Sequence, residues 1–283
     1  MSKHVNRKSS RRKKMADFAD RHALYQKSVQ APEVEVEFMA DTYRALRGRE
    51  PRLLREDFCG TALLATTWCA GDAERTALGV DICAETLAWG REHNVTTAGE
   101  DVARRVQLVQ ADVREVQEPK ADITCAFNFS YCVFKTRDEL RAYFAAARGG
   151  LRPDGMLMLD LFGGKESSDA LEERTKIKGE KAVYVWEHEK FNPIDHHILC
   201  HIHFDFKDGS RLERAFTYDW RLWTLPELSE LLYEAGFSKV RVYWERFEED
   251  EDDDEYLTGT GEYYETNEVE NQESWMSYVV AEA

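Results

Sequence analysis

Short apolar runs alternate with amphipathic stretches between residues 52 and 162, and this alternation is the strongest constraint on the fold. Parallel strands joined by crossover helices produce such a pattern, because helices cover both faces of the sheet. The expected strands are residues 52–56, 76–80, 106–110, 123–129 and 156–162. The expected helices are residues 61–70, 84–93 and 137–147, with a turn at residues 152–155. The pattern predicts a doubly wound α/β fold.

The pattern changes after Gly164, where β-branched and aromatic residues largely follow period two. This period is typical of antiparallel strands. Strands are expected at residues 182–189, 197–206 and 211–220, separated by Asn192-Pro193 and Asp208-Gly209 as turns. A helix at residues 226–235, a strand at 239–244 and a closing strand at 275–280 complete the expected elements.

Charge is unevenly distributed along the chain. The 283 residues include 38 Lys+Arg and 54 Asp+Glu, so the formal net charge is −16. Residues 1–14 hold seven basic residues and no acid, which leaves −23 for the rest. The basic arm could contact nucleic acid, but a disordered tail that solubilises the chain or pairs with its own acidic surface is favoured. The acid run from Glu248 to Glu255 predicts a solvated loop at about residues 245–270, without a metal.

The sequence favours a cytoplasmic protein. No apolar run reaches the length of a membrane-spanning helix, and no apolar segment follows the basic arm as in a signal peptide. The cysteines form no C-x-x-C pair, so reduced and mostly buried thiols are expected. They are Cys59, Cys69, Cys83, Cys125, Cys132 and Cys200.

Acidic residues follow three consecutive expected strands. Glu56 follows the first strand and precedes a turn with Gly60, Asp81 ends the second strand, and Asp112 follows the third. The carboxylate of Asp81 can accept hydrogen bonds from both hydroxyl groups of a ribose, and that of Asp112 can accept one from the exocyclic amine of adenine. Either acid alone could equally cap a helix. Together they predict a nucleoside site that needs no phosphate loop.

These motifs resemble those of the class I S-adenosylmethionine-dependent methyltransferases over roughly residues 50–163, with a plausible extension to the carboxyl terminus. The first motif of that family reads Asp-x-Gly-x-Gly-x-Gly. Here Glu56 stands at the position of the acid, while Phe58 and Ala62 replace two glycines, so a tighter loop is expected. Residues 128–131 fall where small-molecule methyltransferases surround the methyl group, and residues 151–155 match the family's turn into the fifth strand.

The resemblance implies a Rossmann-like, seven-stranded sheet that binds S-adenosylmethionine. The implied cofactor-binding residues are Tyr25, Glu56, Phe58, Gly60, Thr61, Asp81, Ile82, Asp112, Val113, Asn128 and Phe129. The implied organisation is a disordered basic tail at residues 1–14, a helical lid at 15–50, a cofactor-binding core at 51–164, a strand insertion that roofs the substrate at 165–224 and the rest of the core sheet at 225–283.

The acceptor is expected between Ser130 and Tyr131 on one side and Arg221, with Trp186 or Trp223, on the other. Arg221 has two interpretations: it anchors an acidic group of the acceptor, or it stacks among its aromatic neighbours as a structural cation. For each of the two tryptophans, a position in the core is favoured over a position in the pocket.

Histidines recur along the strand expected at residues 197–206. His197, His201 and His203 share one face with Leu199 and Asp205. Such a stripe could ligate a metal. The alternation of an exposed sheet face explains it without one, so no metal is expected.

Three functions remain open. The favoured one is methyl transfer to a small molecule. The second is methylation of RNA, DNA or protein, which the basic arm supports but the −23 charge of the remaining chain opposes. The third is a cofactor-binding interaction protein without catalysis. No membrane partner is expected, and the oligomeric state is not determined by the sequence.

Removal of residues 1–14 should leave affinity for S-adenosylmethionine unchanged, because a polar arm has little apolar surface to bury against the rest of the chain. Isothermal titration calorimetry on the full-length and shortened proteins measures this. A large loss of affinity would show instead that the arm closes the cofactor site.

Overall fold

The computed structural model describes residues 13–250 and 253–283, and the chain divides into two units. The core unit comprises Ala31–Asp169, Lys190–Ile198 and Asp219–Ala283. The sheet unit comprises the described part of Met1–Gln30 together with Ala170–Glu189 and Leu199–Tyr218. The segment predicted as a lid, residues 15–50, is therefore divided between the units. Most of the predicted basic tail, residues 1–12, lies outside the described residues.

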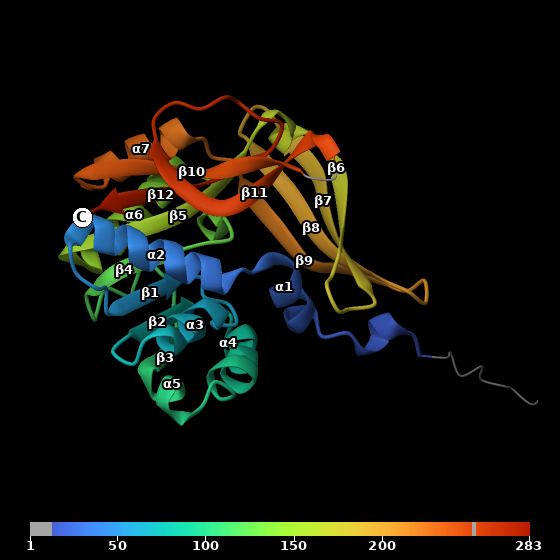
Figure 1. The fold of residues 1–283 in the computed structure, drawn as a ribbon, viewed down its shortest axis with the longest axis horizontal. Helices are drawn as coiled ribbons and strands as arrows, with labels where there is room; N and C mark the ends of the chain where they lie inside the picture. The colour runs from blue at the N-terminus through green and yellow to red at the C-terminus, as the bar shows by residue number, and fades with distance from the viewer. Residues whose placement is uncertain (1–12, 251–252) are drawn as a thin grey trace, which may run out of the picture. The chain divides into compact units, whose positions relative to one another are not determined.

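The core unit contains an eight-stranded sheet in the order β11-β10-β12-β5-β4-β1-β2-β3 among the described residues (Figure 1). Its strands are β1 (Leu53–Asp57), β2 (Thr76–Asp81), β3 (Val106–Gln110), β4 (Ala121–Ala126), β5 (Leu151–Gly163), β10 (Lys239–Asp250), β11 (Asp253–Thr266) and β12 (Trp275–Glu282). The five strands from β1 to β5 pair in parallel, and β12 joins β5 in antiparallel orientation. The predicted α/β class with a mostly parallel sheet is confirmed.

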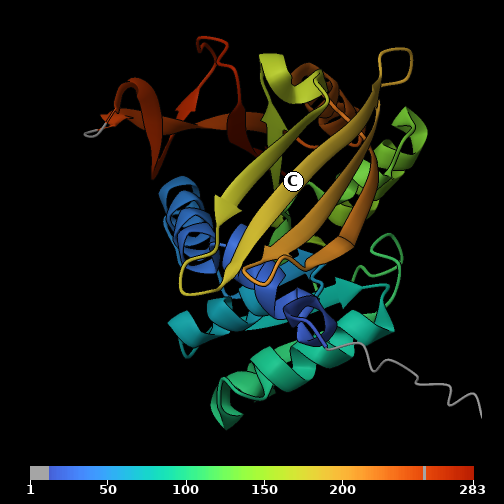
Figure 2. The ribbon, with the colours of Figure 1, turned by 90° about the vertical axis from the view of Figure 1, so that its right-hand side faces the viewer.

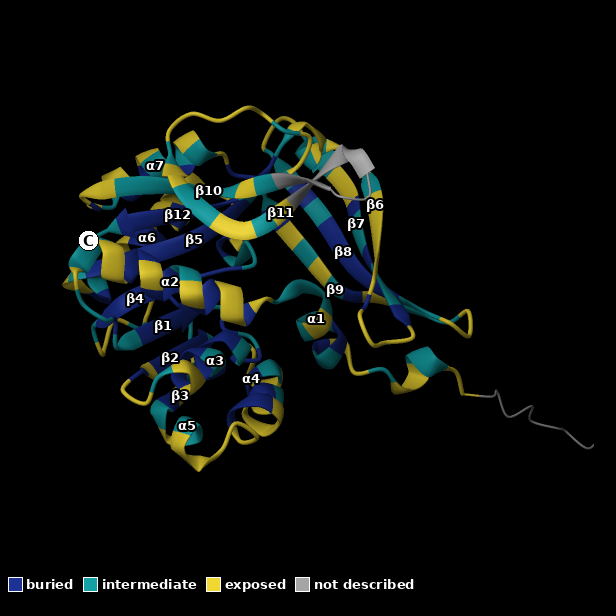
Figure 3. Ribbon diagram, viewed as in Figure 1, coloured by how far each residue is buried: buried dark blue, intermediate teal, exposed yellow. Residues whose placement is uncertain are grey.

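Helices cover both faces of this sheet. They are α2 (Pro32–Arg47), α3 (Leu63–Gly71), α4 (Ala84–Gly90), α5 (Glu100–Arg105), α6 (Arg137–Gly149) and α7 (Leu225–Glu234). Figure 2 shows α2 and α6 on opposite sides of the strands. Every residue of β4 is buried (Figure 3), as expected of a parallel strand between two helical layers. On the α2 side, Met39 and Tyr43 pack with Trp68 of α3 and Leu54 of β1.

The sheet unit contains four strands in the order β6-β7-β8-β9 and the helix α1 (Arg21–Val29). The strands are β6 (Leu171–Lys176), β7 (Ala182–Asn192), β8 (His197–Phe206) and β9 (Arg211–Arg221), and the tips of β7, β8 and β9 belong to the core unit. Leu24 of α1 packs against Ile202, Phe204 and Ala215. The three predicted strands are present, and β6 is additional. The exposed face predicted for the histidines is wrong at His201 and His203, which are each 1% exposed.

The predicted loop at residues 245–270 is wrong, because β10 and β11 form a hairpin there. The sequence-based prediction gave weight to the acids and overlooked the aromatic residues on β11. Tyr263 packs against Phe38 and Tyr278, with ring centroids 5.5 and 4.6 Å apart, and Arg241 pairs with Glu265 at 2.8 Å. These contacts hold the hairpin to the sheet, so the sheet has an eighth strand in place of the predicted seven.

The predicted turn at residues 152–155 lies inside β5. Ala121 pairs with Leu151 and Ile123 with Met156, so β5 accommodates four residues where β4 has only Asp122. The segment is therefore a bulged irregularity within a continuous strand. The fourth strand is also shorter than predicted, because it ends at Ala126.

A buried carboxylate fixes the amino-terminal end of the sheet. Asp122 is fully buried, and its Oδ2 accepts the N–H groups of Arg52 and Leu53, each at 2.9 Å. Its Oδ1 accepts a hydrogen bond from Arg49 at 2.9 Å. Burial opposes ionisation, but the two backbone donors and Arg49 outweigh it and lower the pKa of Asp122.

The Asp122→Asn substitution should lower the free energy of unfolding by about 1.5–3 kcal/mol, because a buried charged acceptor is lost. Asp154→Asn is the matched control: Asp154 also binds Arg49, but its side chain is 46% exposed, so little change is expected. Urea unfolding measures the free energy of unfolding of both variants.

The stabilisation by Asp122 should also depend on pH. Because the folded-state pKa of Asp122 is depressed, its contribution to the free energy of unfolding is complete above about pH 4 and disappears as the pH falls through that pKa. A pH-independent difference would contradict this assignment.

Candidate cofactor and active site

The loop between β1 and α3 takes an unusual backbone form. Phe58, Gly60 and Ala62 have φ angles of 57°, 52° and 54°, in the left-handed region that favours glycine. These are the three positions at which the resembled motif has glycine. All three positions therefore adopt a backbone conformation that favours glycine, although two of the three residues carry side chains.

Neighbouring elements hold this loop. The Gly60 N–H group donates to Asp81 Oδ2 at 2.8 Å, and Asn94 Nδ2 donates to the Thr61 carbonyl at 2.8 Å. Gly90 of α4 packs directly on the loop, since a Cβ atom there would lie 2.2 Å from the Thr61 carbonyl oxygen. The loop is thus fixed from both β2 and α4.

Two acids of the first motif are buried. Glu56 Oε2 accepts the N–H group of Ala65 in the first turn of α3 at 2.9 Å, and burial raises the pKa of Glu56 well above its usual range. Asp57 accepts hydrogen bonds from Arg55 at 2.7 Å and from the Tyr143 hydroxyl at 3.0 Å. Burial raises the pKa of Asp57 to about 6. Asp57 therefore belongs to a structural network, and Glu56 lies beside the loop as predicted.

The other strand-end acids lie at the ends of β2 and β3. Asp81 also accepts the Cys83 N–H group on Oδ1 at 2.8 Å, so it caps the turn into α4 as well as binding the loop. Asp112 pairs with Arg114 at 2.6 Å, and these hydrogen bonds lower the pKa of Asp112. Val113 is buried, whereas Ile82 is 72% exposed and leaves an apolar side chain beside Asp81. The nucleoside site at Asp81 and Asp112 stays a prediction.

The segment after β4 is organised by Asp160 of β5. Asn128 and Phe129 both have left-handed φ angles, and their N–H groups donate to the two oxygens of Asp160 at 2.7 and 2.9 Å. Burial raises the pKa of Asp160 to about 7. Ser130 Oγ donates to the Phe127 carbonyl at 2.9 Å. Tyr131 is fully buried and its hydroxyl donates to the Asp160 carbonyl at 2.6 Å, which does not fit the expected role at the acceptor.

The sequence analysis missed Glu35, in the first turn of α2. Glu35 is 9% exposed, and burial together with the nearby negative charge of Asp160 raises its pKa to about 8. The charge of Glu35 in turn contributes to the raised pKa of Glu56. Within residues 13–250 and 253–283, Glu35, Glu56 and Asp160 form no ion pair with Lys, Arg or His. We call Glu35, Glu56 and Asp160 the acid cluster.

Two residues expected at the acceptor have structural partners. The Arg221 guanidinium lies 3.8 Å from the ring centroid of Trp223 and donates to Glu227 at 2.7 Å. This arrangement corresponds to the structural alternative given above. Trp223 is 1% exposed and its Nε1 donates to the Phe134 carbonyl at 3.1 Å, so it is a core residue.

Two further expected residues lie in the sheet unit. Tyr25 packs against Phe216, with ring centroids 5.0 Å apart, and Trp186 lies 5.9 Å from Tyr218. The cysteines are free, and all except Cys83 are buried, as predicted.

A family model described as a methyltransferase domain matches residues 57–159, the segment that holds the loop and the strand-end acids. Residues 57–159 are a methyltransferase domain. The predicted family and the prediction of an enzyme are thereby confirmed for this segment. A solved structure with this fold holds S-adenosylmethionine, in agreement with the predicted cofactor. No curated protein sequence matches the chain.

Solved structures of methyltransferases share the fold of the methyltransferase domain and of most of the chain around it. An S-adenosylmethionine-dependent methyltransferase from Clostridium acetobutylicum ATCC 824 is 16% identical, with a TM-score of 0.66 over 92% of this chain and 96% of that one. CalS10, an amino pentose methyltransferase from Micromonospora echinaspora, is 18% identical, with a TM-score of 0.64 over 92% and 95%. The sugar N-methyltransferase KedS8 from Streptoalloteichus sp ATCC 53650 is 16% identical, with a TM-score of 0.61 over 93% and 92%.

The described part of the chain contains no helix that is both long and apolar enough to cross a membrane.

The Asp81→Ala substitution should weaken binding of S-adenosylmethionine roughly ten- to a hundredfold, because hydrogen bonds to a charged acceptor are lost. Asp101→Ala is the control, since Asp101 is an exposed acid of α5. Calorimetry measures both affinities, and circular dichroism checks that the Asp81 variant is folded. Unchanged affinity in a folded Asp81 variant would refute the assignment of Asp81 to the ribose.

Proposed function

We propose that the protein transfers the methyl group of S-adenosylmethionine to a small-molecule acceptor. Two of the solved structures with this fold are described as an amino pentose methyltransferase and a sugar N-methyltransferase. In the proposal, Asp81 and Asp112 bind the nucleoside, with Gly60, Thr61, Ile82 and Val113 around it.

The acid cluster is the observation that carries the proposal. Burial of three carboxylates without a cation disfavours their ionised form. The pKa values of Glu35, Glu56 and Asp160 are raised for this reason. A cationic ligand would favour the ionised form. S-adenosylmethionine carries two positive groups, the sulfonium and the ammonium of its amino acid end. The acid cluster therefore favours a cationic nucleoside over a neutral or anionic one.

Methyl transfer requires little chemistry from the protein. A lone pair of the acceptor forms a bond to the methyl carbon while the carbon–sulfur bond breaks, and the sulfonium becomes a neutral thioether. The protein has to align the two reactants and exclude water. If the acceptor carries a proton on the attacking atom, a general base is needed to receive it.

The charge distribution supports a small acceptor over a nucleic acid. The chain beyond residue 14 carries −23 and would repel a phosphate backbone. The direct test incubates the protein with cell extract and methyl-labelled cofactor, then separates small molecules, nucleic acids and proteins. Label is expected in the small-molecule fraction. Label only in RNA, DNA or protein would refute the proposed acceptor class, and cofactor binding without any transfer would favour a non-catalytic role.

Glu35→Gln should remove part of the pH dependence of cofactor binding. Glu35 has a pKa of about 8 in the free protein and must be ionised to attract a cation, so affinity should rise with pH between about 6 and 8 and a proton should be released on binding. The variant should bind several-fold more weakly at pH 8.5 and about as tightly as the wild type at pH 6, where Glu35 is already protonated.

Glu37→Gln is the matched control, because Glu37 is an exposed acid of the same helix and does not contribute to the raised pKa of Glu35. It should keep the pH profile of the wild type and thereby account for titration of the cofactor's own amino group. Calorimetry at several pH values measures each profile. Parallel profiles for the wild type and the Glu35 variant would exclude Glu35 from the cofactor site.

A further inference from the structure

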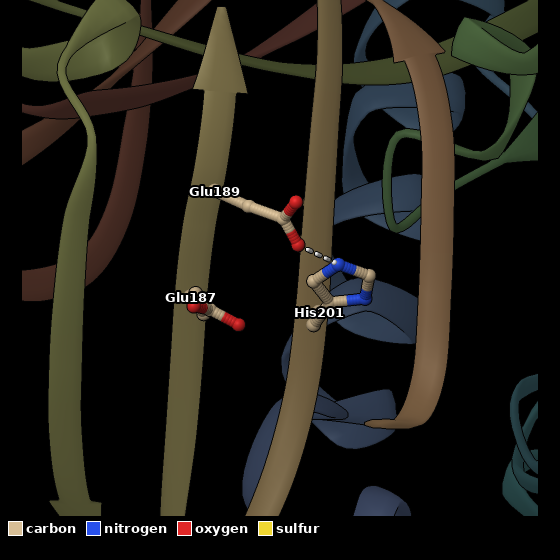
Figure 4. Close-up of side chains that lie close together, drawn as sticks. All are labelled: Glu187, Glu189 and His201. Carbon is tan, nitrogen blue, oxygen red and sulfur yellow. Dashed lines mark hydrogen bonds and ion pairs between the residues drawn. The ribbon is translucent and has the colours of Figure 1, made fainter. Parts of the chain in front are cut away.

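A second group of potential ligands lies on the sheet unit. Glu187 and Glu189 belong to β7, and His201 belongs to the neighbouring strand β8 (Figure 4). Each residue offers one ligand atom, and these three atoms all lie within 4.8 Å of one another. The His201 ring is buried, whereas the side chains of Glu187 and Glu189 are 32% and 38% exposed. A cation could therefore enter from solvent and meet a rigidly held imidazole.

The neighbouring His203 is not a ligand, because its tautomer is fixed. The Arg214 backbone N–H group donates to His203 Nδ1 at 3.0 Å, so Nδ1 carries the lone pair. The proton of the neutral ring is then on Nε2, which donates to Glu187 Oε2 at 2.9 Å. His203 orients Glu187, as outer groups commonly orient the carboxylate ligands of metals.

His201 differs from His203 in this respect. Its Nδ1 lies 2.9 Å from the Thr217 hydroxyl, which can accept a hydrogen bond as readily as donate one. With Nδ1–H donating to Thr217, the lone pair of Nε2 points at Glu189, whose Oε2 is 2.7 Å away. His201 can thus present a lone pair on Nε2 without breaking its contact to Thr217.

The distribution of charge on this face leaves one carboxylate without a cation. Arg174 and Arg211 pair with Glu172 and Asp205. Arg214 pairs with Glu189 Oε2 at 2.9 Å. In the described part of the chain Glu187 has only the neutral His203 as partner. The Oε1 atoms of Glu187 and Glu189 accept no hydrogen bond in the same residues, so both have lone pairs available.

We propose that Glu187, Glu189 and His201 bind one divalent transition-metal ion of the zinc type. One imidazole nitrogen with carboxylate oxygens is a donor set that such ions accept, and three protein ligands leave a further position to water. The ion joins β7 to β8, with Thr217 holding His201 and His203 holding Glu187. This site is independent of the proposed methyl transfer.

The test is calorimetric titration of the full-length protein, stripped with a chelator, with Zn²⁺. The wild type should bind one equivalent that His201→Gln loses, with affinity at that equivalent falling at least a hundredfold. Glu187→Gln, at a partly exposed position that tolerates the change, should lower the affinity at least tenfold. His203→Gln should cost about tenfold, as expected of a group behind a ligand. Thermal unfolding should shift upward with Zn²⁺ in the wild type and not in the His201 variant.

His197→Gln is the matched control, because His197 is on the same strand but pairs with Asp219. It should bind Zn²⁺ as the wild type does, which shows that the loss in His201→Gln is specific to that histidine. Zn²⁺ bound at the acid run of residues 248–255 or at Cys83 would instead persist in the His201 variant. Equal Zn²⁺ binding in the wild type and in the folded His201 and Glu187 variants would overturn the proposal. A larger loss for His203→Gln than for His201→Gln would overturn the assignment of ligands.

Discussion

Backbone N–H groups at the carboxyl ends of the central strands depend on carboxylates for their hydrogen bonds. Glu56 accepts from Ala65, Asp81 from Gly60, and Asp160 from both Asn128 and Phe129. An N–H group removed from water without an acceptor is costly, so these acids stabilise the fold. They also concentrate negative charge at the one edge of a parallel sheet where ligands bind. The structural requirement and the preference for a cationic cofactor thus have the same origin.

The first loop shows how packing can maintain a strained backbone. A left-handed conformation costs a residue with a side chain about 1–2 kcal/mol, and Phe58 and Ala62 both adopt it. Ala62 is fully buried, and the Phe58 ring packs against Tyr143 at 5.7 Å between centroids. Tertiary contacts offset the strain, which is why the loop keeps its form without two of the motif's glycines.

Much of the core could be predicted from the sequence, because parallel strands leave a periodic apolar pattern and Asp81 and Asp112 follow those strands directly. Glu35 could not be found in this way. Its burial depends on how α2 packs against the sheet, and nothing in the adjacent sequence separates it from the exposed Glu33. The acids of the β10–β11 hairpin concealed the aromatic contacts of Tyr263, and the bulge at residues 152–155 has the composition of a turn. Similarly, period two placed His201 correctly on its face but predicted that this face is exposed, whereas His201 is buried.

The acid cluster is expected to bind the positively charged end of the cofactor. A crystal structure of the protein with S-adenosylhomocysteine, which keeps the ammonium group of the cofactor, shows whether it does. We expect the ribose hydroxyls on Asp81, the adenine amine on Asp112, and the ammonium nitrogen within hydrogen-bonding distance of Glu35 or Asp160. A ligand whose ammonium group points away from the acid cluster, with Glu35 and Asp160 still unpaired, would contradict it.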